Sequence, residues 1–126
     1  MPYLDYAASA PLRAEALAAM LPLLERPAAN PSSQHRQGRA ARAAVETARE
    51  QVAALVGAAP AEVVFTSGGT EADNLAVKGA VLVRPPGERH LVCSAVEHHA
   101  VLDAAAWAEA DAGAEVDLAP VDGSGR

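Results

Sequence analysis

The sequence predicts an α/β fold, with a mainly parallel sheet flanked by helices and a helical segment at its N-terminal end. Three observations support this prediction. Short apolar runs alternate with longer segments in which apolar residues recur every three or four positions. Glycines and prolines separate these segments. Strands joined through helices pair in parallel and need helices on both faces of their sheet.

The chain has 126 residues, which suits one domain or part of one. Residues 1–10 are expected to be extended or irregular. A helix is predicted over Pro11–Arg26, because proline suits a first helical turn, and Pro22 should kink or shorten that helix. The composition of residues 27–33, rich in proline, asparagine and serine, indicates a loop.

A second helix is predicted over Gly38–Val56, with Gly57 as its C-terminal cap and Pro60 blocking its continuation. Its apolar face is formed by Ala41, Val45, Ala48, Val52 and Leu55. The rest of the chain alternates between strand and helix patterns. We expect strands over Glu62–Thr66, His90–Ser94 and Ala114–Leu118, and helices over Thr70–Val83 and His99–Ala112.

Charge and composition exclude several classes of function. The net charge of −6 and the absence of a dense basic cluster argue against a nucleic-acid partner. No apolar run approaches the roughly 20 residues of a membrane span, and the first residues lack the pattern of a signal peptide. A single cysteine, Cys93, permits no internal disulfide, so we expect a cytoplasmic setting.

The segment FTSGGTEADN, residues 65–74, predicts an anion site. Its two glycines precede a predicted helix, where free N–H groups and the helix dipole attract negative charge. With the hydroxyls of Ser67 and Thr70, the turn from Ser67 to Glu71 suits a phosphate. The spacing fits neither a Walker loop nor a dinucleotide fingerprint. An alternative is a tight turn with Thr70 as the helix N-cap.

The segment SAVEHHAVLDAA, residues 94–105, places His98 and His99 beyond the carboxyl end of a predicted strand. Ligands bind at that edge of parallel sheets, so the glycine turn and one imidazole could face one cleft. The alternative is a solvated histidine pair that caps the following helix. The histidine spacing does not suit a metal site, and we predict none.

Four blocks together resemble one known family: YLDYAASAP, NPSSQHRQGRAAR, VVFTSGGTEADNLAVKG and SAVEHHAVLD. In this order they are similar to the N-terminal part of the cysteine desulfurases, class V aminotransferases of the pyridoxal-phosphate (PLP) fold type I. The resemblance implies residues 1–15 as a small-domain-like arm and residues 16–126 as the first part of the large cofactor-binding domain.

The resemblance also implies roles for three residues. Gly69 and Thr70 match the step that holds the phosphate of the PLP cofactor, and His98 matches the histidine that stacks on its ring and transfers protons. The implied reaction converts L-cysteine to L-alanine and leaves the sulfur on an enzyme cysteine as a persulfide. That sulfur would serve iron–sulfur clusters or another acceptor or scaffold protein, and the family's members are homodimers.

The family's Schiff-base lysine, its aspartate at the pyridine nitrogen and its persulfide cysteine match positions farther along than Arg126. Lys78, inside a predicted helix, and Cys93, inside a predicted buried strand, are not expected to replace them. We therefore expect the 126 residues alone to be inactive and marginally stable. Alternatives are another class V enzyme, such as a selenocysteine lyase or an aminotransferase, and a non-catalytic module that binds PLP or phosphate.

Overall fold

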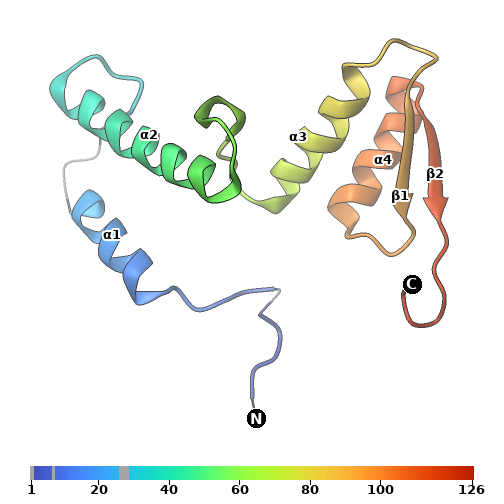
Figure 1. Ribbon diagram of the computed structural model, residues 1–126, viewed down its shortest axis with the longest axis horizontal. Helices are drawn as coiled ribbons and strands as arrows, with labels where there is room; N and C mark the ends of the chain where they lie inside the picture. The colour runs from blue at the N-terminus through green and yellow to red at the C-terminus, as the bar shows by residue number, and fades with distance from the viewer. Residues whose placement is uncertain (1, 7, 26–28) are drawn as a thin grey trace. The chain divides into compact units, whose positions relative to one another are not determined.

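The computed structural model describes residues 2–6, 8–25 and 29–126 (Figure 1). The chain divides into two compact units, residues 1–63 and residues 64–126. Each unit is described by itself. The boundary predicted between residues 15 and 16 stays a prediction.

The first helix of the N-terminal unit, α1, spans Ala14–Leu24 and begins three residues later than predicted. Pro11 lies outside it, because the backbone of the N-cap residue Arg13 is extended (φ −69°, ψ 144°) and interrupts the helical dihedral angles. Pro22 lies within the helix, which ends two residues later, as expected for a residue without an N–H donor. The predicted end at Arg26 lies outside the described residues.

Helix α2 spans Arg36–Val56 and ends at Gly57, whose left-handed backbone (φ 71°) confirms the predicted cap. At its start, Nδ1 of His35 accepts a hydrogen bond from the Gly38 N–H (3.2 Å). Gly38 is buried, and an added Cβ atom would lie 2.3 Å from the Ser33 carbonyl oxygen. The glycine therefore lets the preceding loop pack directly on the helix.

The strand predicted over Glu62–Thr66 does not form. Pro60–Glu62 is instead a short 3₁₀ helix, η1, in which the Glu62 carboxylate accepts a hydrogen bond from the Ala59 N–H (2.7 Å). Val63 has extended dihedral angles (φ −96°, ψ 121°), but this segment is not part of the sheet that the described residues form. Val64 remains 62% exposed. An apolar run takes extended geometry here without the neighbouring strand that would make it a buried strand.

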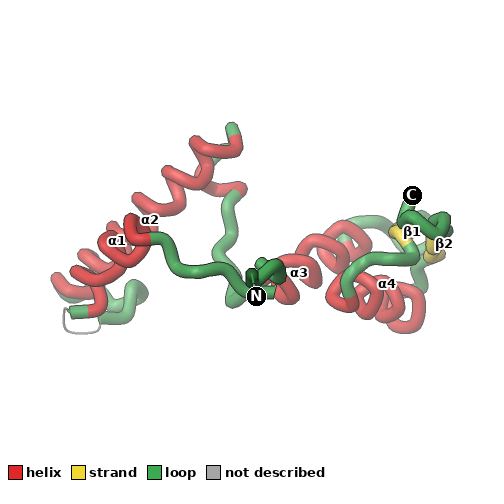
Figure 2. The backbone as a smooth tube through the Cα atoms, turned by 90° about the horizontal axis from the view of Figure 1, so that it is seen from below, coloured by secondary structure: helices red, strands yellow, loops and turns green. Residues whose placement is uncertain are grey.

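The C-terminal unit contains helix α3 (Gly69–Leu82), strand β1 (His90–Ser94), helix α4 (His99–Ala112) and strand β2 (Glu115–Ala119). The two strands pair in parallel, from His90 opposite Glu115 to Ser94 opposite Ala119. Figure 2 shows them side by side. The predicted parallel βαβ arrangement is confirmed, with two strands in place of three in the part of the chain that is described.

Small side chains bring the elements of this unit together. Val81 of α3, Ala108 of α4 and Ala114 form the buried cluster, with Trp107 and Val116 packed against it. Ala100, Ala104 and Ala108 recur at steps of four along α4 and are buried. Alanine at a contact lets two helices approach closely. Helices α3 and α4 therefore pack side by side, and Figure 1 shows both beginning at the end of the unit where β1 ends.

No helix in the described ranges is long and apolar enough to cross a membrane.

Candidate active site

The glycine turn lies directly before α3. Gly68 is the N-cap, with an extended backbone (φ 168°) and no side chain to cap the helix, and Gly69 is the first helical residue. This corrects the alternative in which Thr70 caps the helix. A Cβ atom added at Gly68 or at Gly69 would meet nothing within 4 Å. Packing within the described chain therefore does not require glycine here, and the space beside this backbone is open to a ligand.

Free donors are available at this turn. The Ala72 N–H donates to the Gly68 carbonyl oxygen (3.1 Å), so the amides of Gly69 and Thr70 precede the first bond of the helical ladder. Thr70 is exposed, and no partner for its hydroxyl is found among the residues that the structure describes. Two backbone N–H groups and one hydroxyl, at the positive end of a 14-residue helix, suit a phosphate.

Ser67 is not one of these donors, contrary to the prediction. Its backbone N–H and its hydroxyl both donate to the same Glu71 carboxylate oxygen, at 2.6 and 2.7 Å. The two hydrogen bonds from Ser67 lower the pKa of Glu71 below the ordinary value of a glutamate, so this exposed carboxylate is charged at neutral pH. This contact was not predicted, because the glutamate lies four residues after the serine, whereas a capping box has three.

His98 is the N-cap of α4. Its Nδ1 accepts a hydrogen bond from the Ala100 N–H (3.1 Å), which confirms the capping role considered as an alternative. Because Nδ1 is the acceptor, Nε2 is the ring nitrogen left for a ligand. The rings of His98 and His99 meet edge to face, with centroids 6.4 Å apart. The described residues contain no cluster of metal-ligating side chains.

The two helix starts lie at one end of the C-terminal unit, beyond the carboxyl end of β1 (Figure 1). This is the edge at which parallel sheets bind ligands. The arrangement brings the elements that carry Gly69, Thr70 and His98 to the same end, although the strand predicted before the glycine turn does not form.

Lys78 contacts a tryptophan of α4, and Cys93 lies within β1. The Lys78 ammonium is 4.6 Å from the centre of the Trp107 ring, so it bridges α3 and α4 through a cation–π contact. Lys78 is therefore a packing residue between the two helices. Cys93 is half-buried in β1, which corrects its expected full burial, and it is a free thiol.

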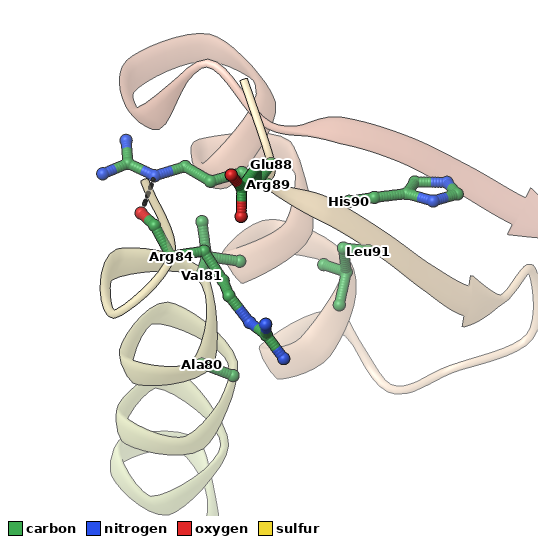
Figure 3. Close-up of a pocket in the computed structure, with 7 residues that line it drawn as sticks. All are labelled: Ala80, Val81, Arg84, Glu88, Arg89, His90 and Leu91. Carbon is green, nitrogen blue, oxygen red and sulfur yellow. Dashed lines mark hydrogen bonds between the residues drawn. The ribbon is translucent and has the colours of Figure 1, made fainter. Parts of the chain in front are cut away.

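A cavity of about 280 Å³ lies at the opposite end of β1 (Figure 3). Its lining includes Arg84, Arg89 and His90, and Arg89 Nε donates to the Arg84 carbonyl oxygen (3.0 Å). His90 is the first residue of the strand, so this cavity lies away from the carboxyl edge. It therefore contributes no residue to the glycine-turn site.

Comparison with known proteins settles the family. Residues 2–126 match the aminotransferase class V family. The chain belongs to this family. It is 47% identical over 123 residues to a cysteine desulfurase IscS of Dictyoglomus turgidum, covering 98% of this chain and 31% of that protein. It is also 47% identical over 128 residues to an IscS-like cysteine desulfurase of Mycobacterium tuberculosis, covering 99% of this chain and 32% of that protein.

Solved structures agree with this assignment. A structure described as SspA in complex with cysteine matches with a TM-score of 0.82 and 39% identity, covering 94% of this chain and 34% of that one. A NifS-like protein matches with a TM-score of 0.83 and 31% identity, covering 94% of this chain and 32% of that one. The predicted resemblance and fold class are confirmed. The chain spans about a third of the length of the relatives it matches.

Proposed function

We propose that this chain supplies the phosphate-binding turn and the ring-contacting histidine of a PLP-dependent cysteine desulfurase. The observation that carries the proposal is the open Gly68–Gly69 turn. Its amides and the Thr70 hydroxyl have no partner among the described residues, and they lie at the end of the unit where α4 also begins. The similarity to cysteine desulfurases over nearly the whole chain supports the choice of cofactor and reaction.

The donor set fits the phosphate of PLP. The Gly69 and Thr70 amides and the Thr70 hydroxyl would hold its oxygens, and the absence of a Cβ atom at Gly69 lets the anion approach the backbone. Lys78 does not contribute its positive charge to the turn, because its ammonium lies over Trp107. Bound PLP supplies an electron sink for the bonds at the Cα atom of an amino acid.

His98 would contact the cofactor ring and carry a proton on Nε2. The bond from the Ala100 N–H to Nδ1 fixes the imidazole at the start of α4 and makes Nε2 the atom that exchanges protons. The side chain is exposed, and α4, which it caps, begins at the end of the unit where the ligand would bind. The catalytic role of His98 and the cofactor roles of Gly69, Thr70 and His98 form one proposed site.

The proposed reaction takes sulfur from L-cysteine and releases L-alanine, with delivery of the sulfur to an acceptor such as an iron–sulfur scaffold. We propose that the whole protein is a cytoplasmic homodimer, by analogy with the family. The 126 residues alone should not turn over cysteine, because Lys78 is held against Trp107 and Cys93 is half-buried in a strand. A mixture of the chain, PLP and cysteine should produce no alanine above the background of free PLP.

The test compares the affinity of the chain for PLP and for pyridoxal, which lacks the phosphate. Free pyridoxal closes to an internal hemiacetal that PLP cannot form, so the change in the PLP-to-pyridoxal ratio between wild type and a variant, measured under the same conditions, reports the phosphate site. We expect PLP to bind more tightly. Thr70→Val should reduce that advantage roughly tenfold, because a hydrogen bond to a charged group is lost. Thr47→Val, at an exposed site on α2, is the matched control.

Equal affinities for PLP and pyridoxal would contradict the proposed function. Binding of PLP with the expected preference but no alanine from the longest natural form of the protein would favour a non-catalytic binding module. Alanine formation by the 126 residues at an enzymatic rate would contradict the proposal that this chain alone does not turn over cysteine.

A further inference from the structure

The Glu71 side chain folds back over the glycine turn. One carboxylate oxygen accepts the N–H and the hydroxyl of Ser67, at 2.6 and 2.7 Å. Two short bonds to one charged oxygen make a strong local contact. Glu71 lies in the first turn of α3, so its charge also interacts favourably with the helix dipole. The contact therefore fixes the Thr66–Ser67 peptide and the Ser67 side chain, directly before Gly68.

A second side chain fixes the peptide that leaves Gly68. The Thr66 hydroxyl donates to the Gly68 carbonyl oxygen (3.1 Å). Because a trans peptide is planar, the carbonyl of Gly68 and the N–H of Gly69 point in opposite directions. Holding this oxygen toward Thr66 therefore sets the direction of the Gly69 N–H. Side chains thus hold the Thr66–Ser67 peptide before the turn and the Gly68–Gly69 peptide within it.

Glycine gives the turn room for an anion but also the largest freedom to move. Two adjacent glycines lose more conformational entropy on ordering than any other pair of residues. A binding turn that is ordered in advance avoids that loss when the ligand arrives. The two donors of Ser67 are already occupied, which leaves the Gly69 and Thr70 groups for the ligand.

We propose that Glu71 is a positioning residue for the phosphate, which acts by clamping Ser67 and so ordering the Gly68–Gly69 turn. This inference rests on the proposed function, since it concerns the same site. Glu71 does not touch the phosphate. Its contribution is the geometry of the donors that do.

The negative charge of Glu71 could instead weaken binding by repelling the phosphate. If Glu71 acted mainly by repelling the ligand, any neutral replacement would tighten binding. If it acts as a clamp, Glu71→Ala weakens binding, while Glu71→Gln keeps an acceptor oxygen and loses less. The two mechanisms therefore predict changes of opposite sign for the same pair of variants.

The chain offers a matched control at its other serine clamp. The Asp122 carboxylate accepts from the N–H and the hydroxyl of Ser124, at 2.8 and 2.7 Å. This clamp follows β2 and lies outside the glycine turn. Asp122→Asn removes a similar charge from a similar contact, so it measures the general effect of losing such a clamp.

The experiment measures the ratio of PLP affinity to pyridoxal affinity for the 126-residue chain and the three variants, together with amide hydrogen exchange at Ser67. We expect Glu71→Ala to lower the ratio roughly fivefold, as for the loss of a helix cap. Glu71→Gln should lower it by a smaller factor, and Asp122→Asn should leave it unchanged. Exchange at Ser67 should accelerate most in Glu71→Ala.

Three outcomes would overturn the inference. A wild-type preference for PLP that Glu71→Ala leaves unchanged would reject the clamp and leave the proposed function intact. A ratio that rises in both Glu71 variants would assign Glu71 a repulsive role. A wild-type chain without preference for PLP would overturn both the inference and the proposed function.

Discussion

Helices α3 and α4 each have 14 residues and begin at the same end of the C-terminal unit, but their first turns differ. The start of α4 is closed by its own sequence, because Nδ1 of His98 accepts the Ala100 N–H. The start of α3 has no side-chain cap at Gly68. Its glutamate binds the serine that precedes the cap, and the described residues offer no acceptor to the amides of Gly69 and Thr70.

The difference separates two uses of a helix N-terminus. In α4 the amide of the first turn stabilises the fold by binding a histidine of the chain. In α3 the corresponding groups have no acceptor among the described residues, which is the arrangement that an external anion requires. The comparison therefore supports the proposal that phosphate binds at the glycine turn and that His98, at the start of α4, presents Nε2.

The largest effect on stability should come from removing the cap of α4. His98→Ala should lower the free energy of unfolding by about 1 kcal/mol, because the Ala100 amide loses its acceptor. His98→Asn restores a short capping oxygen without the ring, so it should keep most of the stability and lose the contact with the cofactor ring. Denaturant unfolding, combined with PLP affinity, checks both. Equal unfolding of wild type and His98→Ala would contradict the capping role.

A smaller effect should follow from giving α3 the cap that it lacks. Gly68→Asn should raise the free energy of unfolding by a few tenths of a kcal/mol, because an asparagine oxygen accepts from the first-turn amides. The same oxygen would compete with phosphate, so the preference for PLP over pyridoxal should fall. Unfolding curves of Gly68→Asn, together with its affinities for PLP and pyridoxal, test both expectations. A more stable variant with undiminished preference would show that the phosphate binds elsewhere.

The sequence predicted correctly the features that depend on a few adjacent residues. The ends of α2 and α4 were predicted correctly, because Gly57 and Gly113 adopt the left-handed conformation that glycine favours at a helix end. The strand over Glu62–Thr66 was predicted wrongly, because pairing depends on a neighbouring strand that a local apolar pattern cannot supply.

The same limit to local signals applied to the candidate site. The glycine turn and the imidazole cap could be recognised, since each depends on a few adjacent residues. The Glu71 clamp and the Lys78 contact with Trp107 could not be, because the first departs from the usual capping spacing and the second joins two helices. The functional roles of Gly69, Thr70 and His98 stay predictions.

The smallest effect should be a change in the pH dependence of stability at the two serine clamps. Hydrogen bonds from Ser67 lower the folded-state pKa of Glu71 below its ordinary value of 4.5. Its stabilisation is therefore complete above pH 4.5 and is lost as the pH falls through the lower folded pKa. Glu71→Gln should flatten the stability profile in that acid range.

Asp122 provides the internal comparison for this pH dependence. Hydrogen bonds from Ser124 and from the Arg126 amide lower its pKa below an ordinary value of 3.8, so its contribution is complete above pH 3.8 and is lost only as the pH falls below that value. Asp122→Asn should therefore leave the profile unchanged near pH 4.5. Acid unfolding curves of Glu71→Gln and Asp122→Asn check that the contribution of Glu71 begins to be lost at a higher pH than that of Asp122. Identical profiles for the two variants would contradict this order.

The most direct test of the contrast between the two helix starts is a titration of the ¹⁵N-labelled chain with inorganic phosphate, followed by amide chemical shifts. We predict that the Gly69 and Thr70 amides shift in a saturable way, while the Ala100 amide, which His98 already binds, does not. Saturable shifts at Ala100 with none at Gly69 and Thr70 would contradict the assignment of the phosphate to the glycine turn.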